Sequence, residues 1–358
     1  MACLIIAEAG VNHNGDIALA HALVDAAVAA GADVVKFQTF KADRMATQRA
    51  PKADYQNVTT DSAESQHAML RRLELTPAMH DELIAYCRQR GIRFLSTPFD
   101  RQSLAYLAGE VGLDLIKIPS GEVTNGPLLL DAARTGRDII LSTGMSALGE
   151  VEAALQVLTF GMLEPTRTPD AARLAQAWQV TEGRVRLRQR VTLLHCTTEY
   201  PAPFDSVNLK AMETMRAAFG LRVGLSDHTV GIAIPIAGAS LGAAIIEKHF
   251  TMDRTLPGPD HKASLEPLEL KAMVEGIRAV EWAMGDGVKC AQEAEIKNME
   301  IARKSLVAAC AIKAGELFSA ENLDVKRPGS GISPMHYWGL LGRPAKCDYD
   351  ADDLIVEW

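Results

Sequence analysis

Residues 222–250, RVGLSDHTVGIAIPIAGASLGAAIIEKHF, contain two short aliphatic runs separated by one helical stretch. The runs at 222–227 and 245–250 are predicted strands, and the Ala-rich stretch at 231–243 is a predicted helix. Strands that alternate with helices are typical of βαβ units and of a parallel sheet. Both runs also carry charged or imidazole side chains near their ends, which is costly in a buried strand unless those groups are compensated. The segment therefore predicts a parallel α/β fold with polar residues at the strand ends.

The same rhythm extends over the first 285 residues. Further strands are predicted at 4–8, 33–39, 93–97, 114–119, 138–143 and 191–197. Helices are predicted at 16–30, 77–90, 101–109, 126–135, 148–160, 208–219 and 266–284, in addition to 231–243. Several strands follow a Gly that is placed to end the preceding helix. Eight strand–helix pairs favour a closed (β/α)₈ TIM barrel over an open dinucleotide-binding sheet, and no GxGxxG or Walker-type loop is present.

The length of 358 residues exceeds the roughly 250 that such a barrel needs. We predict a barrel domain at 1–285, a Lys/Glu-rich helical linker at 286–303 and a small module of short strands at 304–358. Two connections are longer than the fold requires. The polar loop at 41–75 lies on the catalytic side and is a candidate specificity determinant. The insertion at 161–189 lies on the opposite side and is predicted to hold one helix at 169–178.

Composition and charge exclude several classes of protein. A net charge of −8 argues against a nucleic-acid partner, because such proteins need a basic face. Six scattered cysteines without a CxxC pair indicate reduced thiols in a reducing compartment. The N-terminus MACLIIAEAG lacks the features of a signal peptide, and the longest apolar run, near 232–246, is too short to span a membrane. We expect a soluble, cytoplasmic protein.

Polar side chains occur at or near the ends of all eight predicted strands. Active sites of TIM barrels lie where the carboxyl ends of the strands converge, so this pattern predicts an active site at that mouth. The residues concerned are Glu8, Lys36, Gln38, Ser96, Thr97, Lys117, Ser120, Ser142, Thr143, His195, Asp227, His228, Glu247, Lys248 and His249.

Two histidines end neighbouring predicted strands. The imidazoles of His228 and His249 are placed to converge on one ion, and two nitrogen ligands with open positions suit Mn²⁺ or Mg²⁺ better than a closed zinc site. Asp260, in LPGPDHKAS, is a candidate partner of this pair. The alternative is that both histidines are core residues bound to backbone carbonyls, with Asp260 capping a loop.

Two lysines, Lys36 and Lys117, lie on the second and fourth strands. With the hydroxyl and N–H groups of STGM at 142–145, they predict a phosphate-binding site. Each lysine alone is equally consistent with a Schiff-base nucleophile or with a structural ion pair. The role of His195 stays open.

At these residues the chain resembles the N-acetylneuraminate (sialic acid) synthase family, which includes legionaminate and pseudaminate synthases. The similar segments cover almost the whole chain in order. They are IIAEAGVNHNGD (5–16), VKFQTFKADR (35–44), FLSTPFD (94–100), KIPSGE (117–122), ILSTGM (140–145), LLHCTTEYPAPFDSVNLKAM (193–212), GLSDHT (224–229), IEKHFTMDRTLPGPDHKASLEP (246–267) and KRPGSGISP (326–334). The module at 304–358 resembles the family's antifreeze-like (SAF) domain.

The resemblance implies a transferase that condenses phosphoenolpyruvate with an N-acetylated amino sugar and water, and releases phosphate by C–O cleavage. It implies a divalent ion, Mn²⁺ first and Mg²⁺ or Co²⁺ as alternatives, on His228 and His249. It places phosphoenolpyruvate on Lys36, Thr97, Lys117, Ser120 and Ser142. Gln38 and Asp260 fall near the sugar, and Glu247 or, second, Glu8 activates the water. In a domain-swapped homodimer, Arg327 of one subunit contacts the sugar bound by its partner.

The acceptor sugar stays open at this stage. N-acetylmannosamine, giving N-acetylneuraminate, is the first expectation, and a 2,4-diacetamido-2,4,6-trideoxyhexose, giving legionaminate or pseudaminate, is the alternative. More distant rivals are a Schiff-base aldolase, a phosphoenolpyruvate-dependent synthase acting on an aldose phosphate, and a non-catalytic carbohydrate- or ice-binding protein.

Overall fold

The computed structural model describes residues 2–61 and 64–356. The chain divides into two compact units, Met1–Gly285 and Asp286–Trp358. Each unit has its own buried apolar cluster, so each has a core of its own.

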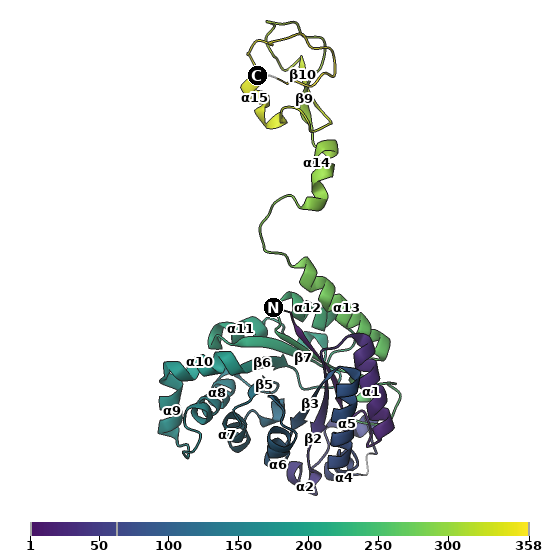
Figure 1. Cartoon of the computed structure of the whole chain (residues 1–358), viewed down its shortest axis with the longest axis vertical. Coiled ribbons are helices and arrows are strands. Elements are labelled where there is room, and N and C mark those ends of the chain that lie inside the picture. The colour runs from purple at the N-terminus through teal and green to yellow at the C-terminus, as the bar shows by residue number, and fades with distance from the viewer. Residues whose placement is uncertain (1, 62–63, 357–358) are drawn as a thin grey trace. The chain divides into compact units, whose positions relative to one another are not determined.

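The first unit is built on eight parallel strands (Figure 1). These are β1 (Leu4–Gly10), β2 (Val34–Thr39), β3 (Arg93–Pro98), β4 (Leu115–Ile118), β5 (Asp138–Ser142), β6 (Val191–Cys196), β7 (Arg222–Asp227) and β8 (Ile245–His249). Their order in the sheet is β3-β2-β1-β8-β7-β6-β5-β4, and the two end strands β3 and β4 also contact each other. The predicted TIM barrel is confirmed, and every predicted strand lies within two residues of an observed one.

Helices surround the strands. They are α1 (Ile17–Ala30), α2 (Ala42–Met45), α3 (Asp54–Thr59), α4 (Gln66–Arg72), α5 (Pro77–Arg90), α6 (Arg101–Ala105), α7 (Gly126–Arg134), α8 (Leu148–Leu163), α9 (Ala171–Gln179), α10 (Thr181–Arg190), α11 (Ala211–Phe219), α12 (Ala233–Ser240) and α13 (Pro267–Ala283). The ends of α1 follow from its sequence: the Asp16 carboxylate accepts from the Ala18 N–H, and Gly31 adopts the left-handed conformation (φ 78°) that ends the helix. The predicted helix at 101–109 is instead α6 followed by a π-helical turn, Tyr106–Glu110.

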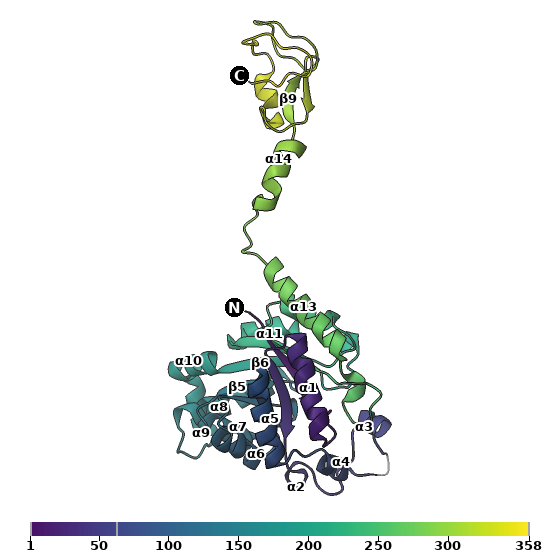
Figure 2. The ribbon, with the colours of Figure 1, turned by 45° about the vertical axis from the view of Figure 1, so that its right-hand side comes forward.

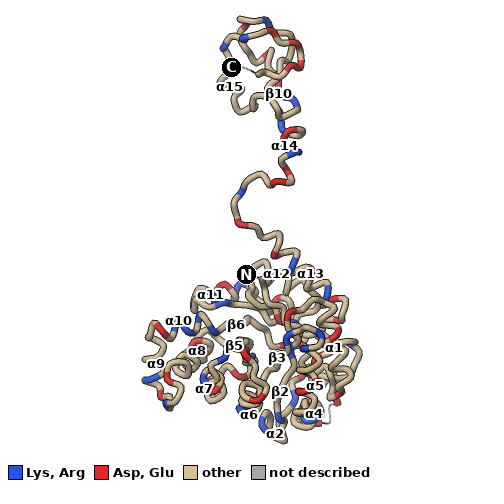
Figure 3. The backbone as a smooth tube through the Cα atoms, in the orientation of Figure 1, with Lys and Arg blue, Asp and Glu red and all other residues tan. Residues whose placement is uncertain are grey.

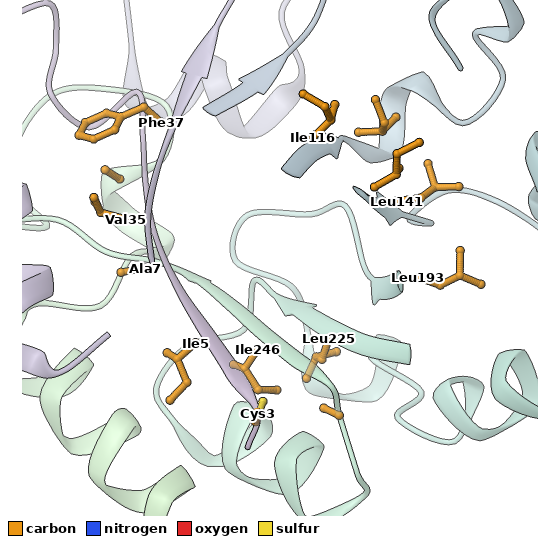
Figure 4. Packing of buried hydrophobic residues seen from close by; sticks show 14 of the residues in the cluster. Cys3, Ile5, Ala7, Val35, Phe37, Ile116, Leu141, Leu193, Leu225 and Ile246 are labelled. Carbon is orange, nitrogen blue, oxygen red and sulfur yellow. The ribbon is translucent and has the colours of Figure 1, made fainter. Parts of the chain in front are cut away.

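Alternation along the strands divides the barrel into an interior and an outer face. Outward residues such as Ile5, Val35, Leu193 and Ile246 pack beneath the helices (Figure 4). The interior is closed by a layer of aliphatic side chains from seven strands: Ile6, Val34, Leu95, Leu115, Ile140, Leu194 and Ile245. On β7 the corresponding residue is Gly224, where a Cβ would collide with the Ile245 backbone oxygen and would lie 2.7 Å from Leu194 Cδ2. The layer is therefore filled without an eighth side chain.

The two long connections contain more helix than the sequence indicates. The 41–75 connection holds α2, α3 and α4; residues 62–63 lie outside the described residues. The 161–189 insertion includes α9 and most of α10, and both pack against α8 (Figure 2). Only one helix was predicted there, because α10 is a polar segment whose buried residues are Gly183 and Leu187. Two buried residues are too few to give α10 the apolar stripe by which an amphipathic helix is recognised in a sequence.

The second unit contains α14 (Ile296–Ala302), β9 (Ser305–Ala308), β10 (Leu323–Lys326) and α15 (Tyr337–Leu340). Strands β9 and β10 are antiparallel, and their apolar residues join Phe318, Leu340 and Tyr349 in one cluster. The predicted helical linker is helical only in its second part, where the short helix α14 follows a 3₁₀ turn at Glu293–Glu295.

Positions of Lys and Arg and positions of Asp and Glu are both distributed along the backbone (Figure 3). Within residues 2–61 and 64–356, no helix combines the length and the apolar character that crossing a bilayer requires.

Candidate active site

A polar layer lies directly above the aliphatic layer inside the barrel. Each of its members follows an aliphatic-layer position by two residues, so strand alternation points both into the interior. The layer consists of Glu8, Lys36, Thr97, Lys117, Ser142, Cys196, Ser226 and Glu247, and all eight are buried. Every strand contributes one member.

Four of these residues form a cluster of opposite charges. Lys36 Nζ lies 2.6 Å from Glu8 Oε2 and 3.6 Å from Glu247 Oε2, and Lys117 Nζ lies 3.1 Å from Glu247 Oε1. Glu247 Oε1 also accepts from Ser226 Oγ at 2.9 Å, and Thr97 Oγ1 accepts from Lys36 Nζ at 2.8 Å. All four charged groups are at most 4% exposed. Such a group is stable in a barrel only because each charge has a partner.

The two carboxylates have opposite electrostatic environments. Burial raises the pKa of Glu8 to about 7, and the charge of Lys36 only partly offsets that effect. Burial also acts on Glu247, but Lys117 and Lys36 outweigh it and hold its pKa well below the usual range. Glu247 is thus ionised at neutral pH, whereas Glu8 is poised to take up or give a proton. Burial lowers the pKa of Lys117, although Glu247 opposes this.

Hydroxyl side chains form a wall in the connections that follow β4, β5 and β6. Ser120 Oγ accepts from the Gly144 N–H at 3.0 Å. Ser142 Oγ and Thr198 Oγ1 are buried and form no hydrogen bond within the protein. Unsatisfied hydroxyls beside a buried lysine are suited to an anionic ligand that supplies the missing acceptors.

Gly144 is the position where this wall tolerates no side chain. A Cβ there would collide with Thr198 Oγ1 and lie 2.8 Å from Ser120 Oγ. We expect Gly144→Ala to raise the KM for the anionic substrate about tenfold or more, because the wall must move. The matched control is Gly149→Ala on α8, where a Cβ meets nothing within 4 Å. Steady-state kinetics of both variants test this; equal KM values in the two variants would contradict it.

His228 and His249 converge above the polar layer. Their ring centroids are 5.4 Å apart, and both rings are buried. His228 Nδ1 donates to the Thr197 carbonyl at 2.7 Å, which leaves its Nε2 as an acceptor. Burial holds the pKa of His249 well below its usual value, so that ring is neutral, as a metal ligand must be.

These features fit a divalent ion with open coordination positions. His249 Nδ1 is buried without a hydrogen bond, and the nearest acid is Asp260, whose Oδ2 lies 3.8 Å away. Burial raises the pKa of Asp260 to about 6. Among residues 2–61 and 64–356, no group of three or more His, Cys, Asp or Glu side chains is arranged to hold a metal. The two imidazoles therefore suit an open site that substrate or water completes, not a closed cage.

Asn12 anchors the loop that carries Asp260. Its Nδ2 donates to the Phe250 carbonyl at 2.8 Å and to Ser264 Oγ at 3.0 Å, and Ser264 Oγ donates to the Asp260 carbonyl at 2.7 Å. Gln38 lies on the other side of β1, where its Nε2 donates to Glu8 Oε1 at 3.3 Å. Gln38 and Asp260 therefore both lie at the mouth, beside Glu8 and His249 respectively.

Several polar strand-end residues face away from the mouth, so their expected contribution to the site is corrected. His195 Nε2 donates to the Val207 carbonyl at 2.5 Å on the outer side of β6. Ser96 contacts Thr39, and Thr143 donates to the Leu194 carbonyl. Asp227 and Lys248 pair with each other. The reason is the two-residue period: of two adjacent polar residues on a strand, one must point outward.

Three residues of the site were missed in the sequence. Cys196 and Ser226 belong to the polar layer and are recognisable by their two-residue spacing from Leu194 and Gly224. The Tyr200 ring packs against the His228 ring, with centroids 4.1 Å apart and the ring planes tilted by 32°. It lies in the connection after β6, where no strand period predicts its direction.

Arg327 lies in the second unit, directly after β10. Its side chain is exposed, and its Nε donates to the Ala302 carbonyl at 3.1 Å. Its predicted role toward a partner's sugar stays a prediction.

Comparisons with known proteins identify the family of the chain. Residues 23–289 match the NeuB family, and residues 303–357 match the SAF domain. The chain is 52% identical to the N,N'-diacetyllegionaminic acid synthase of Campylobacter jejuni over 99% of both chains. It is 43% identical to the enzyme of the same name from Legionella pneumophila, over 99% of this chain and 94% of that one. A crystal structure of N-acetylneuraminic acid (sialic acid) synthetase from Leptospira borgpetersenii, in complex with citrate, is 30% identical with a TM-score of 0.66, covering 84% of this chain and 91% of that one.

The chain belongs to the NeuB family, with a TIM barrel followed by a SAF domain. It is an enzyme of the synthase type, so the predicted family and enzyme class are confirmed. For the acceptor sugar, the comparisons favour the alternative over the first expectation, because the relatives with 52% and 43% identity are named for diacetyllegionaminic acid.

Proposed function

We propose that this enzyme condenses phosphoenolpyruvate with a 2,4-diacetamido-2,4,6-trideoxyhexose and water, giving N,N'-diacetyllegionaminic acid and phosphate. The observation that carries the proposal is the buried cluster of Lys36, Lys117, Glu8 and Glu247 beneath two convergent imidazoles. A non-catalytic sugar-binding protein has no need of four buried charges, which cost free energy to desolvate. The sugar is chosen from the 52% identity to an enzyme named for that product.

Phosphoenolpyruvate carries a phosphate and a carboxylate, and the site offers cations and hydroxyls for both. We place these groups on Lys36, Thr97, Lys117, Ser120 and Ser142. The unpartnered Ser142 hydroxyl and the Ser120–Gly144 wall support this placement. Neither lysine acts as a Schiff-base nucleophile in this proposal. Each lysine already forms an ion pair with a carboxylate, and we propose that it also pairs with the anionic groups of the bound substrate.

The fit of His228 and His249 supports a divalent ion, Mn²⁺ first and Mg²⁺ or Co²⁺ as alternatives. When bound, it would act as a Lewis acid on the aldehyde oxygen of the open-chain sugar. We assign Asp260 and Gln38 to the orientation of that sugar.

Glu8 is our choice for the group that deprotonates the attacking water. C3 of phosphoenolpyruvate forms a bond to the sugar aldehyde, water adds at C2, and the C2–O bond to phosphate then breaks. Glu247 was the first expectation from the sequence, but Lys117 and Lys36 hold its pKa well below the usual range, which makes it a weak base. Glu8 has a pKa raised to about 7 by burial, which suits a base at neutral pH. Lys36 and Lys117 stabilise the charge on the departing phosphate.

We further propose a domain-swapped homodimer in which Arg327 reaches the sugar bound by the partner. Large exposed apolar side chains support an interface: Met335 and Trp338 on the second unit are 79% and 74% exposed, and Met145 and Phe204, in the connections after β5 and β6, are 69% and 62% exposed.

Six free thiols, three of them buried, support the cytoplasm as the location of the proposed enzyme.

Arg327→Ala tests the role of the second unit. We expect the sugar KM to rise about tenfold or more, with little change in the KM for phosphoenolpyruvate, because only the sugar loses a contact. In a mixture with Glu8→Gln, exchange of subunits should restore part of the activity, since one mixed site then has both residues. Equal effects on the two KM values, or no restored activity after exchange, would remove the proposed contact. Arg343→Ala on the same unit is the control.

The acceptor is tested by phosphate release from phosphoenolpyruvate with Mn²⁺ and either sugar. We expect kcat/KM for 2,4-diacetamido-2,4,6-trideoxymannose to exceed that for N-acetylmannosamine by about tenfold or more. A pocket built to pair a substrate amide strongly rejects an analogue that lacks it. A preference for N-acetylmannosamine would return the assignment to N-acetylneuraminate.

A further inference from the structure

A buried ion pair joins β7 and β8 on the outer face of the barrel. Lys248 Nζ lies 2.5 Å from Asp227 Oδ2, and the two side chains are 0% and 1% exposed. Asp227 and Lys248 are also register partners in the parallel sheet, so they extend from adjacent points on the same face. The pair faces away from the polar layer and contacts none of its members through a hydrogen bond or ion pair that the structure records.

The pair is more than one contact, because it also fixes the start of the β7–α12 connection. Asp227 Oδ1 accepts from the Thr229 N–H at 3.1 Å, and Asp227 Oδ2 accepts from Thr229 Oγ1 at 3.0 Å. Lys248 Nζ also donates to the Thr229 carbonyl. Residues 227 and 229 are thereby both tied to β8, and the residue between them is His228.

Packing alone does not explain why two charged residues, Lys248 and Asp227, are buried at this position. Burying a lysine and an aspartate costs desolvation free energy, and apolar residues of similar volume are often equally stable in such places. What a charged pair adds is a fixed direction and distance. Here it fixes the two strand positions that immediately precede His228 and His249.

We propose that Lys248 and Asp227 are positioning residues that hold the imidazoles of His228 and His249 at the separation that one divalent ion requires. Adjacent residues on a strand point to opposite faces, so a shift of the outer pair moves both inner rings. Their centroids are 5.4 Å apart, and a small change in that spacing decides whether both nitrogens reach one ion. This inference rests on the proposed metal site.

The test is direct Mn²⁺ binding, followed by the electron paramagnetic resonance signal of the free ion, together with the melting temperature. The double variant Lys248→Met/Asp227→Asn removes both charges, keeps the shapes and leaves an amide oxygen at position 227 as an acceptor for the Thr229 N–H. We expect its Mn²⁺ Kd to rise about 10- to 100-fold, the range for residues that orient metal ligands. Its melting temperature should stay close to that of the wild type, because no unpaired charge remains.

Two further variants keep the result decisive. Asp227→Glu retains the charge and lengthens the side chain by one methylene, so it should fold and still weaken Mn²⁺ binding. Arg278→Met/Asp33→Asn neutralises another ion pair on this barrel, at 2.7 Å, and should leave the Mn²⁺ Kd unchanged. Wild-type affinity in both Lys248/Asp227 variants would overturn the positioning role. Absence of Mn²⁺ binding in the wild type would instead overturn the metal site, and this inference with it.

Discussion

Glu8→Gln is expected to lower kcat by about 10² to 10⁴-fold, the contribution of a positioned general base. The amide keeps the shape of the side chain and its contact with Gln38 but cannot accept a proton. In the wild type, kcat/KM should rise with pH through about 7 and then level off, because Glu8 must be ionised to act and burial raises its pKa to about 7. In the variant this limb of the pH profile should disappear.

A control separates this effect from simple loss of a charge. Glu281→Gln alters a carboxylate that contacts Cys3 N and Arg278, at the amino end of β1. It should leave the profile unchanged. Retention of the limb near pH 7 in Glu8→Gln would transfer the role of base to another group, with Glu247→Gln the next variant to measure.

His249→Ala is expected to abolish measurable Mn²⁺ binding and to lower kcat by at least about 100-fold, because Lewis-acid stabilisation is worth several kcal/mol. One imidazole with no second protein ligand holds a labile ion poorly. Treatment of the wild type with EDTA should give the same loss, reversible with Mn²⁺. Isothermal titration and phosphate release measure the two effects.

His195→Ala is the matched control, because this imidazole lies near the end of another barrel strand, β6, but donates to the Val207 carbonyl on the outer face. It should bind Mn²⁺ like the wild type. If His249→Ala retained both Mn²⁺ affinity and turnover, the site would have to lie elsewhere.

The strands of this protein are predictable because they alternate with helices in aliphatic runs that Gly residues punctuate. Gly31 and Gly91 end α1 and α5 with positive φ, and each is followed within three residues by a strand. The polar helix α10 was not predictable, because its two buried residues, Gly183 and Leu187, form no apolar stripe. The ends of the strands also indicated most of the candidate site residues in the barrel, because a buried charge within an aliphatic run costs free energy unless it is compensated.

The sequence did not reveal in which direction the side chains at the strand ends point, or what electrostatic environment surrounds each buried charge. At Asp227–His228 and Lys248–His249, one residue of each pair faces inward and the other outward, and only the register of the barrel decides which. Similarly, the sequence alone does not distinguish Glu8 from Glu247, because both are glutamates near the end of a strand. Glu247 pairs with both Lys36 and Lys117, whereas Glu8 pairs with Lys36 alone, and this difference makes Glu247 a held anion and Glu8 a candidate base.

In the proposed reaction, the barrel mouth joins phosphoenolpyruvate to a diacetamido sugar with cleavage of the C–O bond. The most direct measurement uses phosphoenolpyruvate labelled with ¹⁸O at the oxygen bridging C2 and phosphorus, with the diacetamido sugar and Mn²⁺, and mass spectrometry of both products. We predict that the label appears in the released phosphate and that the sugar gains three carbons. Label retained in the organic product, or phosphate released without sugar, would contradict the account.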